Sequence, residues 1–151
     1  MNIRAYHTSD DQAIIALLRL NTPAYFAPSE EEDLLDYFAH HIDHYYVVES
    51  AGAIVGCGGF NLTPDGKTAK ISWDIIHPDS HGKGIGSQLT VFRIREMLKI
   101  DSVEIISVRT SQLVYIFYEK FGLEVKEIVK DFWADGFDLY RMECRKELVR
   151  V

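Results

Sequence analysis

The chain has 151 residues, a formal net charge of −7 and a hydrophobic content of 47%. These values predict one globular domain over residues 1–151, long enough to enclose a core. The acidic charge argues against nucleic acid as the main partner, because phosphate binding needs a basic face. No stretch approaches the roughly 20 apolar residues of a membrane helix, and the N-terminal MNIRAYHTSDD lacks the apolar centre of a signal peptide. We therefore expect a cytoplasmic protein that does not bind membranes.

The first part of the chain predicts a short strand over residues 2–6 and then two helices. Ser9 and Gln12 have the spacing of a capping box, so the first helix is expected to begin at Ser9 and to end at Thr22-Pro23. Ser29 and Glu32 repeat that spacing at the start of the second helix.

The remainder alternates between strand-like and helix-like periodicity. Strands over 45–50, 54–62 and 68–77 are separated by the tight turns 51–52 and 63–66, which predicts an antiparallel meander. A helix over 84–99, a strand over 103–108, a helix over 111–121 and strands over 123–129 and 137–145 follow. This order predicts an α/β (α+β) domain with a mixed central sheet flanked by helices on both faces.

A glycine-rich loop lies between the strand that ends at His77-Pro78 and the helix that follows it. Its glycines are Gly82, Gly84 and Gly86. Glycine allows positive φ and a close approach of the backbone to a ligand. The first N–H groups of the helix point outward at the positive end of its dipole, which suits phosphate oxygens. The alternative is a tight turn without a ligand, although one turn rarely needs three alternating glycines.

Two common phosphate-binding motifs do not fit this loop. The dinucleotide motif G-x-G-x-x-G would place its third glycine at Ser87 or at Leu89. A Walker loop would need a glycine at His77 and a serine or threonine at Gly84. A nucleotide-binding phosphotransfer domain is therefore disfavoured.

The loop instead resembles the acyl-CoA loop of the GNAT acetyltransferases, Gln/Arg-x-x-Gly-x-Gly/Ala, with His81 in the Gln/Arg place. The resemblance extends from Ile3 to Glu147 and is weakest over residues 20–45. It implies that acetyl-CoA is the cosubstrate and that the backbone around Ile75 and Ile76 polarises its thioester carbonyl. The residues that it places around the cofactor in this loop are His81, Gly82, Lys83, Gly84, Ile85, Gly86 and Ser87.

A second segment, Ser111 to Leu123, resembles the GNAT signature Asn-x-x-Ala-x-x-x-Tyr-x-x-x-Gly-Phe. Tyr118 and Gly122 match it. In a helix over 111–121, Ser111, Val114 and Tyr118 would lie on one face. The resemblance implies that this face meets the pantetheine arm of the cofactor and that the Tyr118 hydroxyl protonates the departing thiolate. On the helix alone, a core aromatic is the alternative reading of Tyr118.

The sequence also departs from the family pattern. Ser111 replaces the usual Asn, Leu123 replaces Phe, and Lys70 stands near the position where many relatives carry a glutamate base. The general base is therefore unassigned. Asp74 is a candidate, because in a regular strand Ser72, Asp74 and Ile76 share one face. It is either a proton acceptor for the amine or a structural carboxylate, and the sequence favours neither.

No metal site is expected. His40 and His44 have an i, i+4 spacing that could bind a metal, but the catalytic glutamate of a zinc protease motif is not nearby. We expect an N-acetyltransferase whose partners are acetyl-CoA and a primary amine, with attack by the amine in a ternary complex. The alternative is an acyl-CoA-binding module without turnover. The sequence does not identify the acceptor amine, and it is compatible with a homodimer.

Overall fold

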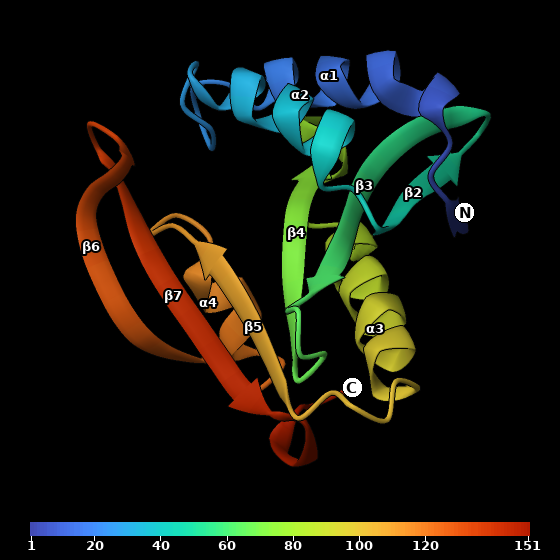
Figure 1. Ribbon diagram of the computed structural model, residues 1–151. Coiled ribbons are helices and arrows are strands. Elements are labelled where there is room, and N and C mark those ends of the chain that lie inside the picture. The colour runs from blue at the N-terminus through green and yellow to red at the C-terminus, as the bar shows by residue number, and fades with distance from the viewer. The chain divides into compact units, whose positions relative to one another are not determined.

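The computed structural model describes all residues from 1 to 151. Strand β1 (Asn2–Ala5) is followed by helices α1 (Asp11–Leu20) and α2 (Glu30–His40) and by strands β2 (His44–Ser50), β3 (Ala53–Leu62) and β4 (Thr68–Ile76). The second half contains α3 (Ile85–Leu98), β5 (Ile105–Thr110), α4 (Tyr115–Glu119), β6 (Glu124–Ala134) and β7 (Phe137–Arg145) (Figure 1). Three short 3-10 helices complete the structure. They are η1 (Thr8–Asp10), η2 (Pro78–Ser80) and η3 (Lys146–Leu148).

The strands form one mixed sheet in the order β1-β2-β3-β4-β5-β7-β6. β1 pairs with β2 and β2 pairs with β3, both antiparallel, and the second pairing is the one that the turn at Ala51-Gly52 predicted. β4 and β5 run parallel, and β7 is antiparallel to both β5 and β6. The predicted fold class, a mixed sheet with helices, is therefore confirmed.

The chain divides into two compact units. The first comprises residues 1–60 and 72–93. Buried side chains of α1 and α2 pack against one face of its strands, and Ile85 and Leu89 of α3 pack against the other face through Val48. The helices of this unit therefore cover both faces, as predicted. None of the helices of the chain is long and apolar enough to cross a membrane.

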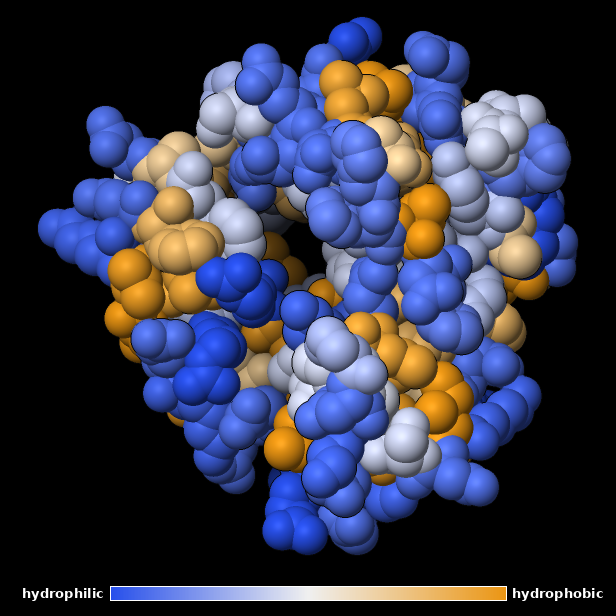
Figure 2. Space-filling view, viewed as in Figure 1, coloured by the Kyte–Doolittle hydropathy of each residue, from blue (hydrophilic) through white to orange (hydrophobic).

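The second unit comprises residues 61–71 and 94–151. Here β5 lies between β4 and β7, and α4 contacts β7 through Tyr115 and Tyr140, whose ring centroids are 4.6 Å apart. The outer strand β6 exposes Ile128, Val129 and Phe132, and Figure 2 shows apolar patches among the charged side chains in that region.

Both predicted capping boxes are wrong. The first helical segment is capped two residues earlier, at His7, where the His7 ring accepts from the Ser9 N–H and the Asp10 carboxylate accepts from the His7 N–H. Arg4 holds that carboxylate with two further hydrogen bonds, so tertiary contacts select Asp10 as the capping group. At α2, Ser29 has helical dihedral angles and no capping bond, and the Glu30 carboxylate accepts from the Ala27 N–H instead.

Two later elements differ in length from their predictions. α4 is shorter than the expected helix over 111–121, because residues 112–114 form a turn ahead of it. β6 extends to Ala134, beyond the predicted end at residue 129, through a register shift that contains Asp131 at φ 54°. Gly122 has φ 93° and ends the helical segment.

Candidate active site

The glycine-rich loop opens directly into α3. Gly82 and Gly84 have φ values of 76° and 81°, which is the left-handed region that glycine adopts without strain. The Gly84 carbonyl accepts the first helical hydrogen bond, from the Gln88 N–H, at 3.0 Å. The N–H groups of Gly84, Ile85, Gly86 and Ser87 have no acceptor in the protein. Such a row of outward N–H groups at a helix start binds anions.

The loop leaves room for a ligand. A methyl group built on Gly82 or Gly84 would have no protein atom within 4 Å, so these glycines are required by their dihedral angles and not by packing. Lys83 is exposed between them and adds a positive charge. The sequence-predicted residues from His81 to Gly84 are all exposed, whereas the Ile85 side chain is buried in the core.

The start of the loop is fixed through the Ile76 carbonyl. This oxygen accepts from the Asn21 amide at 3.0 Å and lies 2.9 Å from Nε2 of His81. Asn21 is buried and also donates to the Leu17 carbonyl at 2.8 Å. The Tyr25 ring meets the His81 ring edge-on, with centroids 5.2 Å apart. His81 therefore has a structural contact inside the loop in addition to its predicted place beside the cofactor.

Asp74 is paired with a buried arginine. Arg93 of α3 has a fully buried side chain and donates to both oxygens of Asp74, at 2.9 Å for the Nη2–Oδ2 pair. It also donates to the Gly59 carbonyl at 3.1 Å. A side chain at Gly58 would collide with both members of the pair. The glycine on β3 therefore makes space for the ion pair, and Asp74 has a structural partner.

A distortion in β4 separates Ser72 from Asp74. Trp73 has φ 50°, a strained value for a bulky residue, and its carbonyl accepts from the Tyr45 hydroxyl at 2.8 Å. Ser72 hydrogen-bonds to Tyr37 of α2, whereas Asp74 pairs with Arg93 of α3. The predicted common face of Ser72 and Asp74 is therefore wrong, because the positive φ between them interrupts the alternation of a regular strand.

Burial raises the pKa of two side chains near β4, the Tyr37 phenol and the Cys57 thiol. It raises the pKa of Tyr37 to about 12, although the hydrogen bond with Ser72 acts in the opposite direction. Burial also raises the pKa of the Cys57 thiol to about 12. Both groups are neutral at physiological pH, and neither can supply the anionic base of an acyl transfer.

The second motif lies in the other unit and forms a turn followed by a short helix. The Ser111 hydroxyl accepts from the Leu113 N–H at 3.2 Å, and the Ser111 carbonyl accepts from the N–H groups of Val114 and Tyr115, both at 3.1 Å. Ser111 and Val114 thus precede α4 and do not share a continuous helix face with Tyr118. Tyr118 lies within α4 with 3% of its surface exposed, and its ring meets Phe117 edge-on.

Two buried polar residues of the first unit, Arg93 and Asn21, were not predicted from the sequence. Arg93 recurs at i+4 from Leu89 and i−4 from Met97, both fully buried, so helical periodicity alone could have placed it on the buried face. Asn21 gave no comparable signal, because its partner Ile76 lies 55 residues away in the chain.

The two histidines with metal-compatible spacing have other contacts. His40 lies 3.0 Å from the Asp36 carboxylate, and the His44 ring stacks on Phe60 at 4.4 Å. No group of three or more His, Cys, Asp or Glu side chains in the chain could hold a metal ion.

Comparison with known proteins decides the family. The sequence matches the Acetyltransferase (GNAT) family over residues 12–123. The chain belongs to the GNAT family of acetyltransferases. The resemblance predicted from the glycine-rich loop and the tyrosine motif is therefore confirmed.

The curated relatives of this GNAT chain share only about a quarter of the aligned residues with it. It is 27% identical over 131 residues to an amino-acid acetyltransferase of Pasteurella multocida (strain Pm70), covering 83% of this chain and 28% of the relative. A second, from Actinobacillus pleuropneumoniae serotype 3 (strain JL03), is 25% identical over 118 residues, which is 74% of this chain and 25% of the relative. The chain thus spans about a quarter of the length of the curated relatives it matches.

Solved structures share the fold over nearly the whole chain. An aminoglycoside 6'-N-acetyltransferase complexed with coenzyme A superposes with a TM-score of 0.76 at 15% identity, covering 97% of both chains. The ribosomal-protein-S18-alanine N-acetyltransferase of Escherichia coli gives a TM-score of 0.79 at 15% identity, covering 99% of this chain and 95% of that one. The TM-scores show a common fold, and at 15% identity the comparison does not identify the acceptor.

Proposed function

We propose that this GNAT protein moves the acetyl group of acetyl-CoA to a primary amine, by direct attack in a ternary complex. The observation that carries the proposal is the row of unpartnered N–H groups from Gly84 to Ser87, behind an exposed loop that holds two left-handed glycines. This is a phosphate-binding arrangement, and its pattern in the sequence matches the acyl-CoA loop of the family. His81, Gly82 and Lys83 belong to the same loop, and Ile85 begins α3 directly after it.

Acetyl-CoA supplies the activated acetyl group, and the chain supplies orientation and proton transfer. The amine nitrogen bonds to the thioester carbonyl carbon, and the carbon–sulfur bond then breaks. We assign polarisation of the carbonyl to the backbone around Ile75 and Ile76, beside the distorted segment at Trp73. Tyr118 donates its phenolic proton to the sulfur. Ser111 and Val114 lie just before α4 and are assigned to the pantetheine arm.

The nitrogen must also lose a proton. Asp74 remains a candidate acceptor, directly or through a water molecule, but its pairing with Arg93 supports a structural role equally well. Lys70 stands near the position where many relatives carry a glutamate base. The curated relatives are named for amino acids, which makes the α-amino group of an amino acid the first acceptor to test.

The test is acetyl-CoA-dependent release of free thiol across a panel of amino acids, polyamines, amino-sugars and peptides, with mass spectrometry of the products. We expect thiol release that depends on one acceptor class. Gly84→Asp is the control variant, because its side chain would enter open space, its charge would repel phosphates, and aspartate tolerates the left-handed φ better than most residues. Tight acetyl-CoA binding without thiol release by any amine would favour the acyl-CoA-binding module instead.

A further inference from the structure

An arginine without an acidic partner lies at the carboxyl end of β5. Arg109 is exposed, and its guanidinium carbon lies 4.9 Å from the centroid of the Phe132 ring and 5.7 Å from that of Trp133. The guanidinium makes no hydrogen bond or ion pair with the protein. In a chain of net charge −7, acidic side chains are abundant, so an unpaired guanidinium that lies beside two aromatic rings needs an explanation.

The cross-strand neighbour of Arg109 is a second arginine, Arg141, which does have acidic partners. Arg141 of β7 pairs directly with Arg109 in the register of the sheet, so both side chains leave the same face. Arg141 donates to Glu127 at 3.1 Å and to Glu143 at 3.3 Å. Glu127 and Glu143 of this face are therefore engaged by Arg141, and the charge on Arg109 remains available to a ligand.

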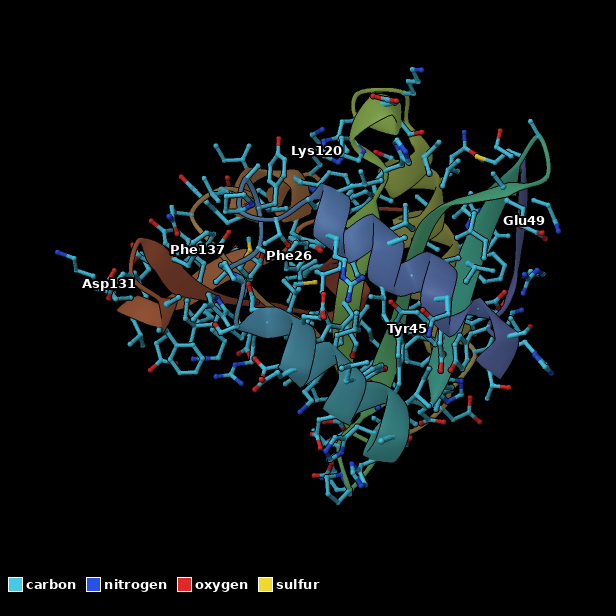
Figure 3. The ribbon with its side chains drawn as sticks, turned by 90° about the horizontal axis from the view of Figure 1, so that it is seen from above. Phe26, Tyr45, Glu49, Lys120, Asp131 and Phe137 are labelled. Atoms are coloured by element: carbon cyan, nitrogen blue, oxygen red, sulfur yellow. The ribbon has the colours of Figure 1, made fainter.

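The aromatic side chains around Arg109 are held in place by the end of the β6–β7 hairpin. The Trp133 indole donates to the Thr110 carbonyl at 3.1 Å. The Gln112 amide donates to the Gly136 carbonyl at 2.7 Å and accepts from the Asp138 N–H at 2.9 Å. The Asp131 carboxylate accepts from the Gly136 N–H at 2.8 Å. Figure 3 shows Asp131 and Phe137 at the tip of this hairpin.

The position along the chain connects this cluster with the proposed chemistry. Arg109 stands two residues before Ser111, and residues 111–114 form the turn that leads into α4 and Tyr118. Two extended residues span about 7 Å. All of these residues belong to the same compact unit. A group bound by Arg109 would thus lie beside the segment to which we assign the pantetheine arm.

The chemistry of the cluster indicates what it binds. A guanidinium is planar, permanently charged and weakly hydrated, and it binds a carboxylate through two parallel hydrogen bonds. Aromatic rings beside it restrict its rotation and exclude water from part of its surface. One guanidinium matches the single charge of a carboxylate.

We propose that Arg109 is a specificity-determining residue that binds the carboxylate of the acceptor, so that the acceptor is a small amine that also carries a carboxylate. This inference rests on the proposed acetyl transfer for its place in the reaction. It excludes polyamines as preferred acceptors, because they have no group for Arg109 to bind. The guanidinium holds the acceptor by its carboxylate and takes no part in bond making.

The experiment compares amino acids with their carboxamides, which keep the amine and lose the negative charge. In the wild type we expect kcat/KM for the best amino acid to exceed that for its carboxamide roughly tenfold or more, since a site built for a polar group rejects the analogue without it. Arg109→Gln should raise KM for the amino acid by a similar factor, change kcat little, and leave the carboxamide unaffected. Arg141→Gln is the matched control and should keep the discrimination.

Two kinetic results would overturn the proposal. One is equal kcat/KM for amino acid and carboxamide in the wild type. The other is an equal loss for both acceptors in Arg109→Gln, which is the signature of a merely structural contact with Phe132 and Trp133. Calorimetric titration of the same ligands into protein saturated with acetyl-CoA gives a readout without turnover. Binding that disappears in Arg109→Gln supports the carboxylate site even where acetyl transfer fails, and absent or unchanged binding contradicts it.

Discussion

Asp74 and Arg93 together show how one residue can have both a structural and a chemical interpretation. The guanidinium of Arg93 has no exposed surface, and a buried charge is tolerated only with a well-placed partner. Asp74 supplies that partner through both carboxylate oxygens. Its role as a proton acceptor during acetyl transfer stays a prediction, and stability measurements can separate the two roles.

Asp74→Asn should lower the free energy of unfolding by about 3–5 kcal/mol, the usual loss when one member of a buried ion pair is removed. The physical cause is the guanidinium left without a counter-charge in the core. Chemical denaturation followed by circular dichroism measures this change. The double variant Asp74→Leu with Arg93→Met should recover much of the lost stability, because it removes both charges.

The pair of variants also addresses catalysis. Turnover that returns with stability in the double variant would show that Asp74 is not the base. Unchanged stability together with lost turnover in Asp74→Asn would instead contradict the structural role and identify the carboxylate as the proton acceptor.

Tyr118→Phe should lower turnover by roughly ten- to a thousandfold, the range for loss of a proton donor, and should leave acetyl-CoA affinity nearly unchanged. The substitution keeps the ring in its buried position and removes the hydroxyl. Thiol release with the best acceptor measures turnover, and calorimetry measures affinity. Tyr115→Phe is the control, since the Tyr115 ring contacts Tyr140 and should cost far less. Near-normal turnover in Tyr118→Phe would make Tyr118 a packing residue.

The helices and strands differ in how well local sequence predicts them. The strands of the meander and α3 agree with their predictions within a residue or two, because alternating and helical periodicities report directly on which side chains are buried. The capping boxes fail because several polar residues compete at each helix start. Arg4, which precedes η1 in the chain, decides the competition in favour of Asp10, and no local pattern records that contact.

This capping contact leads to a pH-dependent prediction. The hydrogen bonds from Arg4, in the main, hold the pKa of Asp10 below its ordinary value, so ionised Asp10 stabilises the folded state. That contribution is complete above the unfolded pKa of about 3.9 and is lost as the pH falls through the lower pKa of the folded protein. Asp10→Asn should therefore lower the free energy of unfolding by about 1–2 kcal/mol near neutral pH and by less at acidic pH.

Urea denaturation of wild type and Asp10→Asn at a series of pH values from about 7 down to about 3 measures this difference. Asp135→Asn is a suitable control for the exchange of a carboxylate for an amide, because Asp135 is exposed. A difference between wild type and Asp10→Asn that stays constant over the whole range would contradict the assignment of Asp10 as the ionised cap.

At the scale of the whole molecule, the sequence predicted the family and the order of elements better than the contacts within the site. The loop from His81 to Ser87 could be recognised because its glycines and the flanking strand and helix are consecutive in the chain. The contact of Arg109 with Phe132 and Trp133 could not, because it depends on the register shift around Asp131 in β6. Neither alternation nor composition signals a left-handed residue at that position.

The loop also determines how the whole protein should respond to its cosubstrate. A ligand that binds only the folded state stabilises it by about 2.7 kcal/mol at a hundred times its Kd. For a chain of this length, that corresponds to a rise in Tm of about 5–10 °C. Differential scanning fluorimetry with increasing acetyl-CoA should show this rise, whereas ATP and NADH should produce much smaller shifts. Gly84→Asp should abolish the shift with acetyl-CoA while it retains a cooperative transition, since the added side chain meets no protein atom and the left-handed φ costs an L-residue only about 1–2 kcal/mol. A larger shift with ATP than with acetyl-CoA would show that the row of N–H groups at the start of α3 serves a nucleotide phosphate and not the acyl carrier.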